Sequence, residues 1–376
     1  MKSTHHVYIG LGSNKGDRLK YLQDAVDAIF VQIGKVTAIA KVYSTPALGF
    51  KGEDFFNTCM HVESHLSVQE ILVELQSIEK KLGRRPKQTE GYESRVIDLD
   101  ILFYDSDSIS TENLVVPHPA LSKRKFVLKP LCDIAGKVKH PQLGKTVAEL
   151  LEICEDDSKV TSISKWLKNP FKHFDFSMFN YIAIEGNIGA GKTSLAHQIA
   201  SDFNAKLILE RFADNAFLPK FYEAPERYAF ALEMSFLADR YQQITDDLAQ
   251  LDLFKDFVVS DYDIFKSLIF SKVTLPKEEF LLYRRLFNLM YKDITKPNLY
   301  VYLYQNTERL QKNIQERGRD YEQNIDDEYL EKINLGYLDF LKNQSELKVN
   351  IIDISNRDFV NNRADYLWIL AEICDV

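Results

Sequence analysis

The chain has 376 residues, 45% of them apolar and 27% charged, which is enough for two domains with separate hydrophobic cores and excludes a wholly disordered protein. Its net charge of −8 excludes a protein that grips nucleic acid through a generally basic surface. Because its four cysteines are far apart and no stretch is apolar enough for a signal peptide or a membrane span, we expect a cytoplasmic protein whose partners are small molecules, with neither nucleic acid nor membrane among them.

The first half of the sequence alternates strand-like and helix-like patterns. Strands are predicted over 6–13, 35–48, 55–66 and 94–105, and helices over 16–33 and 67–83. The second helix has Ser67 as its N-cap, Glu70 three residues later and Gly83 as its stop, which is typical of a capping box followed by a C-terminal glycine. This order predicts an α+β domain with helices packed on a sheet.

Two aspartates in the strand 94–105 indicate a site for a magnesium-bound nucleotide. If Ile97 and Leu99 face one side of the strand, Asp98 and Asp100 both face the other, since side chains alternate. Two carboxylates on one face repel unless a cation lies between them, which favours Mg²⁺ bound through nucleotide phosphates; the alternative is a solvated strand face. Basic residues that suit a phosphoryl or pyrophosphoryl transfer surround the pair in the sequence: Arg84, Arg85, Arg95, His118 and Arg124.

Ordered motifs in residues 7–154 resemble the 6-hydroxymethyl-7,8-dihydropterin pyrophosphokinase family: "GLGSNKGDR", "YSTPALG", "FFNTC", "LQSIEKKLGR", "RVIDLDIL" and "VPHPALSKRKFVLKPL". The resemblance implies a ferredoxin-like α+β sandwich that transfers pyrophosphate from ATP to the pterin alcohol and leaves AMP. It also implies that Asp98 and Asp100 hold Mg²⁺ and that Arg84 and Arg95 are mobile catalytic arginines that handle the phosphates. The other ATP-binding residues that it implies are Gln76, Glu79, His118 and Arg124.

The same resemblance implies a pterin pocket with aromatic, amide and wall residues. They are Thr45, Pro46, Leu48, Phe55, Asn57 and Phe126, although each aromatic is also compatible with an ordinary core role. The loop "GRRPKQTEGYESR" departs from the family pattern, because it is one residue longer than the form compared and lacks its tryptophan and its middle arginine. We expect Tyr92 to take the covering role of the tryptophan and Lys87 that of the arginine, which puts the rate of loop closure in doubt rather than the reaction type.

The polar and then basic stretch 154–180 indicates a domain boundary. We predict a first domain over 1–158, a linker over 159–178 and a second domain over 179–376. In the second domain, apolar strands at 181–184, 206–210, 256–261, 299–304 and 349–354 recur between helical stretches. That order predicts an α/β domain with a parallel sheet wrapped by helices.

A phosphate-binding loop begins directly after the strand at 181–184. The text "GNIGAGKT" fits GxxxxGK[ST] fully and is followed by a helical stretch, which is the context that the motif requires. Lys192 neutralises the β and γ phosphates and the Thr193 hydroxyl holds Mg²⁺ in such loops. The remaining loop residues expected to bind ATP are Gly186, Asn187, Gly189 and Gly191. Glu210, at the end of the next strand, is a candidate base for a hydroxyl acceptor.

From about Tyr181 onward the sequence resembles the deoxyribonucleoside kinase family, through the loop, the glutamate after the second strand, "FYEAPERYAF" and the lid-like "RGRDYE". The resemblance implies that Glu210 is the general base for the 5′-hydroxyl. Tyr222 and Glu322 match residues that bind the sugar 3′-hydroxyl, and Arg317 and Arg319 match lid arginines that close on the phosphates. Tyr222 is also compatible with a core role, and the arginines with a solvated helix end.

Two positions depart from that family's pattern. Glu233 stands where a glutamine commonly binds the base; an ionised carboxylate suits guanine, whereas adenine N1 needs a protonated Glu or a bridging water. The segment "FLPKFYEAPERYAF" looks more like deoxyadenosine-type members, so deoxyadenosine is favoured slightly over deoxyguanosine. Asp261, expected at the substrate, is retained, but Tyr262 stands where an arginine should be, and Lys266 is the candidate replacement for that catalytic cation.

The sequence therefore predicts a bifunctional enzyme in which both halves use Mg²⁺ with ATP as co-substrate, with a homodimer through the C-terminal domain left open. One rival is a regulatory protein in which an inactive N-terminal domain senses a small molecule and controls a P-loop NTPase. A milder rival makes the second half a kinase for another small hydroxyl compound.

Overall fold

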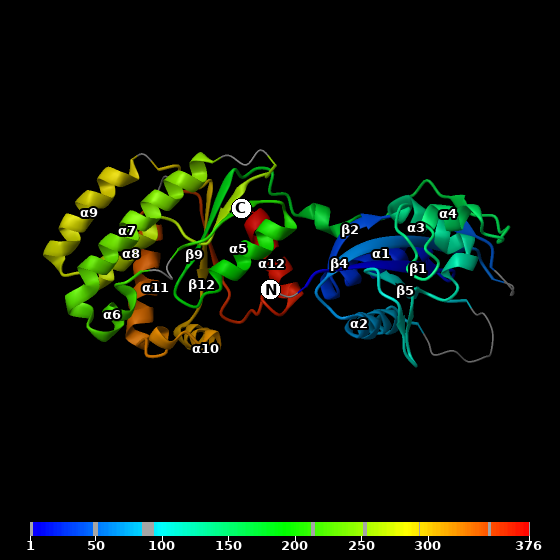
Figure 1. Cartoon of the computed structure of the whole chain (residues 1–376), viewed down its shortest axis with the longest axis horizontal. Coiled ribbons are helices and arrows are strands. Elements are labelled where there is room, and N and C mark those ends of the chain that lie inside the picture. Colours follow the sequence, from blue (N-terminus) through cyan, green and yellow to red (C-terminus); the bar gives the residue numbers. More distant parts are fainter. Residues whose placement is uncertain are drawn as a thin grey trace. The chain divides into compact units, whose positions relative to one another are not determined.

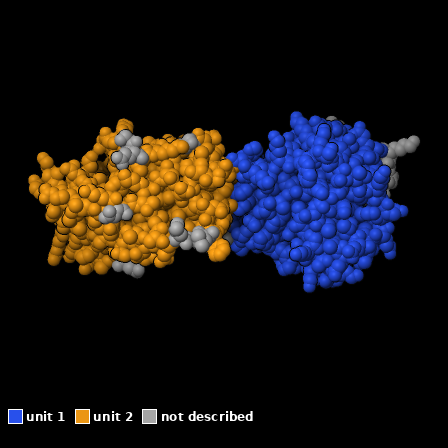
Figure 2. Space-filling view, turned by 90° about the horizontal axis from the view of Figure 1, so that it is seen from above, with its two compact units in different colours: residues 1–173 blue, residues 174–376 orange. Residues whose placement is uncertain are grey.

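The computed structural model describes residues 3–47, 52–84, 94–211, 215–250, 254–292, 294–344 and 347–375. The chain falls into two compact units, Met1–His173 and Phe174–Val376, which are coloured separately in Figure 2. The predicted linker is divided between them, because its residues up to His173 belong to the first unit and those from Phe174 to the second.

The first unit contains an antiparallel sheet whose middle strands are long. Its strands are β1 (His5–Ser13), β2 (Lys35–Ile39), β3 (Tyr43–Thr45), β4 (Phe55–Ser64), β5 (Asp98–Tyr104) and β8 (Thr161–Ser162). The order is β5-β1-β4-β3-β8, with β2 also paired to β4. A separate small hairpin joins β6 (Ile109–Ser110) to β7 (Val115–Val116). The predicted strand 35–48 is two strands here, and the strand predicted over 94–105 begins at Asp98.

Helices cover both faces of this sheet. Helices α1 (Arg18–Gln32) and α2 (Val68–Lys81) contact each other and lie on β1 and β5. On the other face, α3 (Lys125–Ala135), preceded by the short turn η1 (Leu121–Lys123), packs with α4 (Val147–Glu152) over Tyr8 and Phe103. The predicted capping box at Ser67 and Glu70 is confirmed, because both of its hydrogen bonds form. A final turn, η2 (Pro170–His173), lies against α1 and β2.

The second unit contains a five-stranded parallel sheet, as the sequence predicts. Its strands are β9 (Tyr181–Gly186), β10 (Lys206–Ile208), β11 (Val258–Ser260), β12 (Leu299–Tyr304) and β13 (Val349–Asp353), in the order β10-β11-β9-β12-β13. The residues of β9 and β12 are almost wholly buried, which explains why these two strands read as apolar runs rather than as alternating patterns.

Helices wrap both faces of the parallel sheet (Figure 1). The helices are α5 (Lys192–Asp202), α6 (Leu218–Glu223), α7 (Pro225–Ala249), α8 (Phe265–Thr274), α9 (Lys277–Tyr291), α10 (Thr307–Arg317), α11 (Asp327–Lys342) and α12 (Arg363–Cys374), with a short turn η3 (Asp320–Glu322). Tyr181 and Ala183 pack with α7, α8, α9 and α11 in one core, so Ile182 and Ile184 face the opposite layer. Helix α5 contacts β9, β10 and β11, and α12 contacts β13.

The parallel strands bring polar residues to one edge. The loop after β9 carries the glycine motif, Glu210 follows β10, and Asp261 directly follows β11. In sheets of this kind ligands collect at the carboxyl ends of the strands, so the fold alone places these groups together. Among the helices that the structure describes, none is long and apolar enough to cross a bilayer.

Candidate active sites

The first unit holds a cavity of about 610 Å³ at the end of β1, β4 and β5. Asp100 pairs with Gly10 across the ladder and Asp98 pairs with Gly12, so neither aspartate faces an opposing side chain. A Cβ atom at Gly12 would lie 2.9 Å from the Asn57 side-chain oxygen and would narrow the cavity. The glycines in "GLGS" therefore keep this face of the sheet open. The polar residues that line the cavity are Thr45, Asn57, Thr58, Arg95, Asp98, Asp100, His118, Lys123, Arg124 and Asp156.

The two aspartates differ in their partners. Both oxygens of Asp98 lie 2.8 Å from the Arg95 guanidinium, and the Arg84 guanidinium lies 2.8 Å from the same carboxylate. Arg84 also pairs with Glu79, whose carboxylate accepts the Leu99 backbone N–H at 2.8 Å. Arg84 and Arg95 are therefore brought to the aspartate pair, as the sequence predicted for phosphate-handling groups.

Asp100 lies deeper in the cavity and makes no such ion pair among the described residues. Burial, followed by the neighbouring Asp98 charge, raises the pKa of Asp100, and burial lowers the pKa of His118 beside it. A cation between the two carboxylates would remove this electrostatic cost, so the donor set fits Mg²⁺. No cluster of three or more acidic, histidine or cysteine side chains suited to a metal occurs among the described residues, so other ligands would come from nucleotide and water.

The residues predicted for the pterin line the same cavity as the aspartates. Thr45, Pro46, Phe55, Asn57 and Phe126 all contribute to its wall. The Asn57 amide donates to the Thr45 hydroxyl at 2.7 Å, which fixes the amide orientation inside a buried site.

Two of the predicted residues are not brought to this wall. Gln76 is exposed on α2 and does not line the cavity. Glu79 reaches the site only through Arg84 and the backbone of β5. Leu48 and Tyr92 lie outside the described residues, as do Arg85 and Lys87. Lys123 and Asp156 also line the cavity, although the sequence did not single them out. Lys123 lies within the motif "VPHPALSKRKFVLKPL", whereas Asp156 lies outside the motifs.

In the second unit the glycine loop has the backbone that its motif requires. Gly189 and Gly191 have φ angles of +81° and +82°, and a Cβ atom at Gly191 would stand 2.8 Å from the Phe359 ring. The Lys192 ammonium donates to the carbonyls of Gly186 and Asn187, at 3.0 and 2.9 Å. The Asn187 side chain points elsewhere, because its amide donates to the Leu330 carbonyl on α11.

Two groups whose chemistry suits magnesium meet at the end of the loop. The Thr193 hydroxyl donates to one Asp261 oxygen at 2.5 Å, and the other Asp261 oxygen accepts the Glu210 backbone N–H at 2.8 Å. A hydroxyl and a carboxylate in contact fit Mg²⁺ that is also bound to nucleotide phosphates. Asp261, predicted at the substrate, thus lies next to the predicted metal ligand. Burial and the nearby Lys266 charge lower the pKa of Lys192 to about 8.

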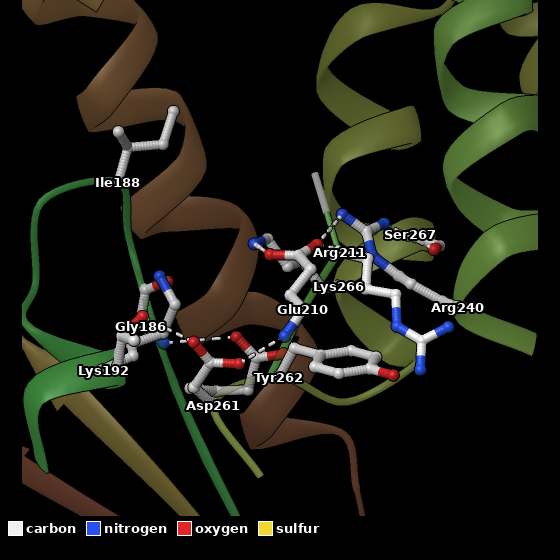
Figure 3. A network of polar contacts seen from close by, with 12 residues as sticks. Gly186, Ile188, Lys192, Glu210, Arg211, Arg240, Asp261, Tyr262, Lys266 and Ser267 are labelled. Carbon is white, nitrogen blue, oxygen red and sulfur yellow. Dashed lines mark hydrogen bonds and ion pairs between the residues drawn. The ribbon is translucent and has the colours of Figure 1, made fainter. Parts of the chain in front are cut away.

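Glu210 is held by two cations (Figure 3). One oxygen accepts from the Arg240 guanidinium at 2.6 and 2.8 Å, and the other accepts from the Lys266 ammonium at 2.6 Å. Burial alone would raise the pKa of Glu210, but the ion pairs with Lys266 and Arg240 outweigh it and hold that pKa well below its usual range. Arg240 also donates to the Ser267 hydroxyl at 2.7 Å.

Tyr262 does not reach this site. Its side chain is fully buried in the helical core, and its hydroxyl has no hydrogen-bond partner among the described residues. Arg240 is a residue of this site that the sequence did not single out. It lies seven residues after Glu233 on α7, which is two helical turns along the same face, and an arginine on a mostly apolar face was the available signal.

A small cavity of about 120 Å³ connects these groups with the lid-like segment. Glu322 is buried and pairs with both Arg317 and Arg319. The predicted lid residues are therefore brought together, and they line the same cavity as Lys192 and Thr193 of the P-loop. The residues from outside the P-loop that line this cavity are Glu210, Leu218, Phe221, Tyr222, Leu232, Glu233, Phe236, Arg240, Asp261, Lys266, Phe270, Arg317, Arg319, Glu322 and Tyr329.

Glu233 occupies the apolar end of this cavity. Its side chain is 3% exposed, and one carboxyl oxygen accepts from the Thr274 hydroxyl at 2.9 Å. The other oxygen has no hydrogen-bond partner among the described residues. Burial raises the pKa of Glu233 to about 7.

Comparison with protein families gives one match for each unit. Residues 182–376 match the model of the family described as deoxynucleoside kinase. Residues 8–136 match the model described as 7,8-dihydro-6-hydroxymethylpterin-pyrophosphokinase.

Individual relatives include proteins of both kinds. A deoxyguanosine kinase of Bacillus subtilis is 36% identical over 197 residues, which cover 51% of this chain and 95% of the relative. A 2-amino-4-hydroxy-6-hydroxymethyldihydropteridine pyrophosphokinase of Aquifex aeolicus is 39% identical over 146 residues, covering 38% of this chain and 88% of the relative. The folic acid synthesis protein fol1 of Pneumocystis carinii is 39% identical over 178 residues, covering 47% of this chain; the match spans only 24% of that longer protein.

Proposed function

The chain belongs to the deoxynucleoside kinase family in its C-terminal part and to the 7,8-dihydro-6-hydroxymethylpterin-pyrophosphokinase family in its N-terminal part, and we propose from this that it catalyses two ATP-dependent transfers on unrelated substrates. The first transfer leaves AMP and the second leaves ADP. The observation that supports the pair of activities best is that each unit has its own cavity lined by phosphate-handling groups.

In the first unit we propose that pyrophosphate moves from ATP to the hydroxymethyl group of 6-hydroxymethyl-7,8-dihydropterin. Asp98 and Asp100 would hold Mg²⁺, which supplies positive charge at the transferred phosphates. Arg84 and Arg95 already contact the Asp98 carboxylate and are close enough to move onto phosphate oxygens. The Asn57 amide and Phe126 ring line the same cavity, as a flat heterocycle with polar edges requires.

In the second unit we propose 5′-phosphorylation of a purine deoxynucleoside. Glu210 would accept the proton of the 5′-hydroxyl at the oxygen that Lys266 contacts, because an ionised carboxylate oxygen can accept a second hydrogen bond. The Lys192 ammonium and the lid residues Arg317 and Arg319 would neutralise phosphate charge. Thr193 and Asp261 would hold the metal, and Tyr222 and Glu322 would bind the sugar.

For the base we propose deoxyadenosine, because burial raises the pKa of Glu233 to about 7 and so makes a neutral carboxyl, which can donate to adenine N1, accessible near neutral pH. Deoxyguanosine is the second candidate, since the ionised carboxylate accepts from guanine and the Bacillus subtilis relative is named a deoxyguanosine kinase.

A homodimer and a cytoplasmic location stay predictions. Exposed Leu281, Leu282 and Leu289 on α9 offer one apolar surface for such a dimer.

Product analysis tests the two proposed reactions separately. The purified chain is incubated with Mg-ATP and either the pterin or each of the four deoxynucleosides, and adenine nucleotides are separated by chromatography. We expect AMP with the pterin and ADP with purine deoxynucleosides. ADP from the pterin reaction would contradict the pyrophosphoryl transfer, and ADP with none of the four deoxynucleosides would contradict the kinase.

A further inference from the structure

Glu233 is a buried acid that lines a ligand cavity and has one carboxyl oxygen without a hydrogen-bond partner among the described residues. Only 3% of the residue is exposed, and its neighbours along the cavity are mostly apolar or aromatic, including Leu232, Phe236 and Phe270. Thr274 donates to one oxygen, and the second has no partner among the described residues. A buried polar atom without a partner costs free energy, so the second oxygen is suited to bind a ligand atom.

The cations near Glu233 are bound to other groups. Arg240, on the same helix, donates from Nε and Nη2 to Glu210 and from Nη1 to Ser267. Lys266, on α8, donates to the other Glu210 oxygen. Two tyrosines also lie near Glu233: Tyr283 on α9, whose hydroxyl donates to the Glu233 carbonyl, and Tyr329 on α11. Tyr222 and the lid residues Arg317, Arg319 and Glu322 line the same cavity.

This balance lets the carboxyl titrate near neutrality. Burial raises the pKa of Glu233 to about 7, and the more distant Arg240 and Lys266 charges lower it only in part. Among the described residues, neither Arg240 nor Lys266 makes a direct ion pair with Glu233; both pair with Glu210. Both protonation states are therefore accessible in ordinary buffers.

We propose that the protonation state of the Glu233 carboxyl decides which purine the kinase site selects. This rests on the proposed deoxynucleoside kinase function. The ionised carboxylate is an acceptor only and accepts two parallel hydrogen bonds, from guanine N1–H and N2–H₂. The neutral acid donates its O–H to adenine N1 and accepts from adenine N6–H₂ with its other oxygen. The ionised carboxylate would face adenine N1, which is also an acceptor. The neutral acid would leave one N–H donor of guanine unpaired.

The proposal predicts how the ratio of kcat/KM for deoxyguanosine to kcat/KM for deoxyadenosine changes with pH. Other ionisations in the site, such as those of Lys192 and Glu210, affect both purines alike and cancel when one kcat/KM is divided by the other. If guanine requires the ionised form and adenine the neutral form, the deoxyguanosine to deoxyadenosine ratio rises about tenfold per pH unit. Between about pH 6 and about pH 8 that is a change of about a hundredfold.

The test is to measure kcat/KM for both purine deoxynucleosides across that pH range in the full chain and in Glu233→Gln. We expect the ratio to rise steeply in the natural protein and to be flat in Glu233→Gln, because glutamine does not titrate. Glu226→Gln is the matched control, since Glu226 is exposed in the first turn of the same helix and its loss should leave the slope unchanged.

A ratio that does not vary with pH in the natural protein would overturn the inference and leave the kinase proposal intact. A slope that persists in Glu233→Gln would also overturn it, because another group would then be responsible. Phosphorylation of neither purine deoxynucleoside would overturn the proposed function itself and the inference with it. The measurement on the natural protein does not depend on whether the variant folds.

Discussion

At the scale of single residues, the kinase site is organised around one carboxylate with two cations. Glu210 shares its oxygens between Arg240 and Lys266, and both cations are more than nine-tenths buried. Removing one partner of such a group leaves buried charge uncompensated. That Lys266 replaces the arginine missing at position 262 remains a prediction. The geometry adds Arg240 as a second cation, which contacts the Glu210 carboxylate through two nitrogens, whereas Lys266 contacts it through one.

We expect Lys266→Ala to lower kcat for deoxynucleoside phosphorylation about a hundredfold, because a cation next to the reacting hydroxyl is lost. Lys266→Arg should recover part of that activity. Lys272→Ala on the same helix is the control, since that lysine is exposed and pairs with Asp339 at the surface. Steady-state kinetics with a purine deoxynucleoside, together with a melting curve for each variant, check this; a normal kcat in Lys266→Ala would refute the role.

At the scale of elements, helix ends and turns hold the functional groups in place. Helix α2 carries Glu79 to the backbone of β5, next to the aspartate pair, and its N-terminus is closed by the capping box at Ser67 and Glu70. The P-loop similarly depends on positive φ angles at Gly189 and Gly191. The strand pair β1 and β5 leaves room for the cavity of the first unit, because glycines oppose both aspartates.

We expect Ser67→Ala to destabilise the first unit by about 1 kcal/mol, because the hydroxyl that caps α2 is lost. For a domain of this size the melting temperature should fall by about 2 to 4 °C. Differential scanning calorimetry checks this, and Ser106→Ala, at an exposed turn, is the control. An unchanged transition in Ser67→Ala would show that the capping box does not stabilise this unit.

At the scale of the whole molecule, two families with different chemistry share one chain. Each unit has its own core, its own sheet and its own candidate site, and the proposed substrates share no intermediate. The regulatory rival requires the first site to be idle and to control the second, whereas the bifunctional interpretation requires two competent sites.

We expect Asp98→Asn to lower AMP formation with the pterin at least about a hundredfold, because a metal-binding carboxylate is lost, while ADP formation with a deoxynucleoside is unchanged. Lys192→Ala should have the opposite pattern. Asp107→Asn, at an exposed turn after β5, is the control for the first variant. Both product assays on each variant decide the question; a change in kinase activity in Asp98→Asn, with its fold intact, would favour the regulatory rival.

Much of the protein follows from local sequence alone. The capping box at Ser67, the P-loop at 186–193, the apolar runs of the parallel strands and the alternation of Asp98 and Asp100 depend on neighbours within a few residues, and the structure bears out each of these local patterns. They could be predicted because turn chemistry and side-chain periodicity act over short distances in the chain.

Tertiary structure alone decided which distant groups meet. The contact of Arg240 with Glu210 joins residues 30 apart, and that of Thr193 with Asp261 joins residues 68 apart. The burial of Tyr262 and the unsatisfied oxygen of Glu233 depend on how four helices pack over the sheet. Burial, and with it the charge state of an acid, is a property of everything that surrounds a residue, and no local pattern in the sequence encodes it.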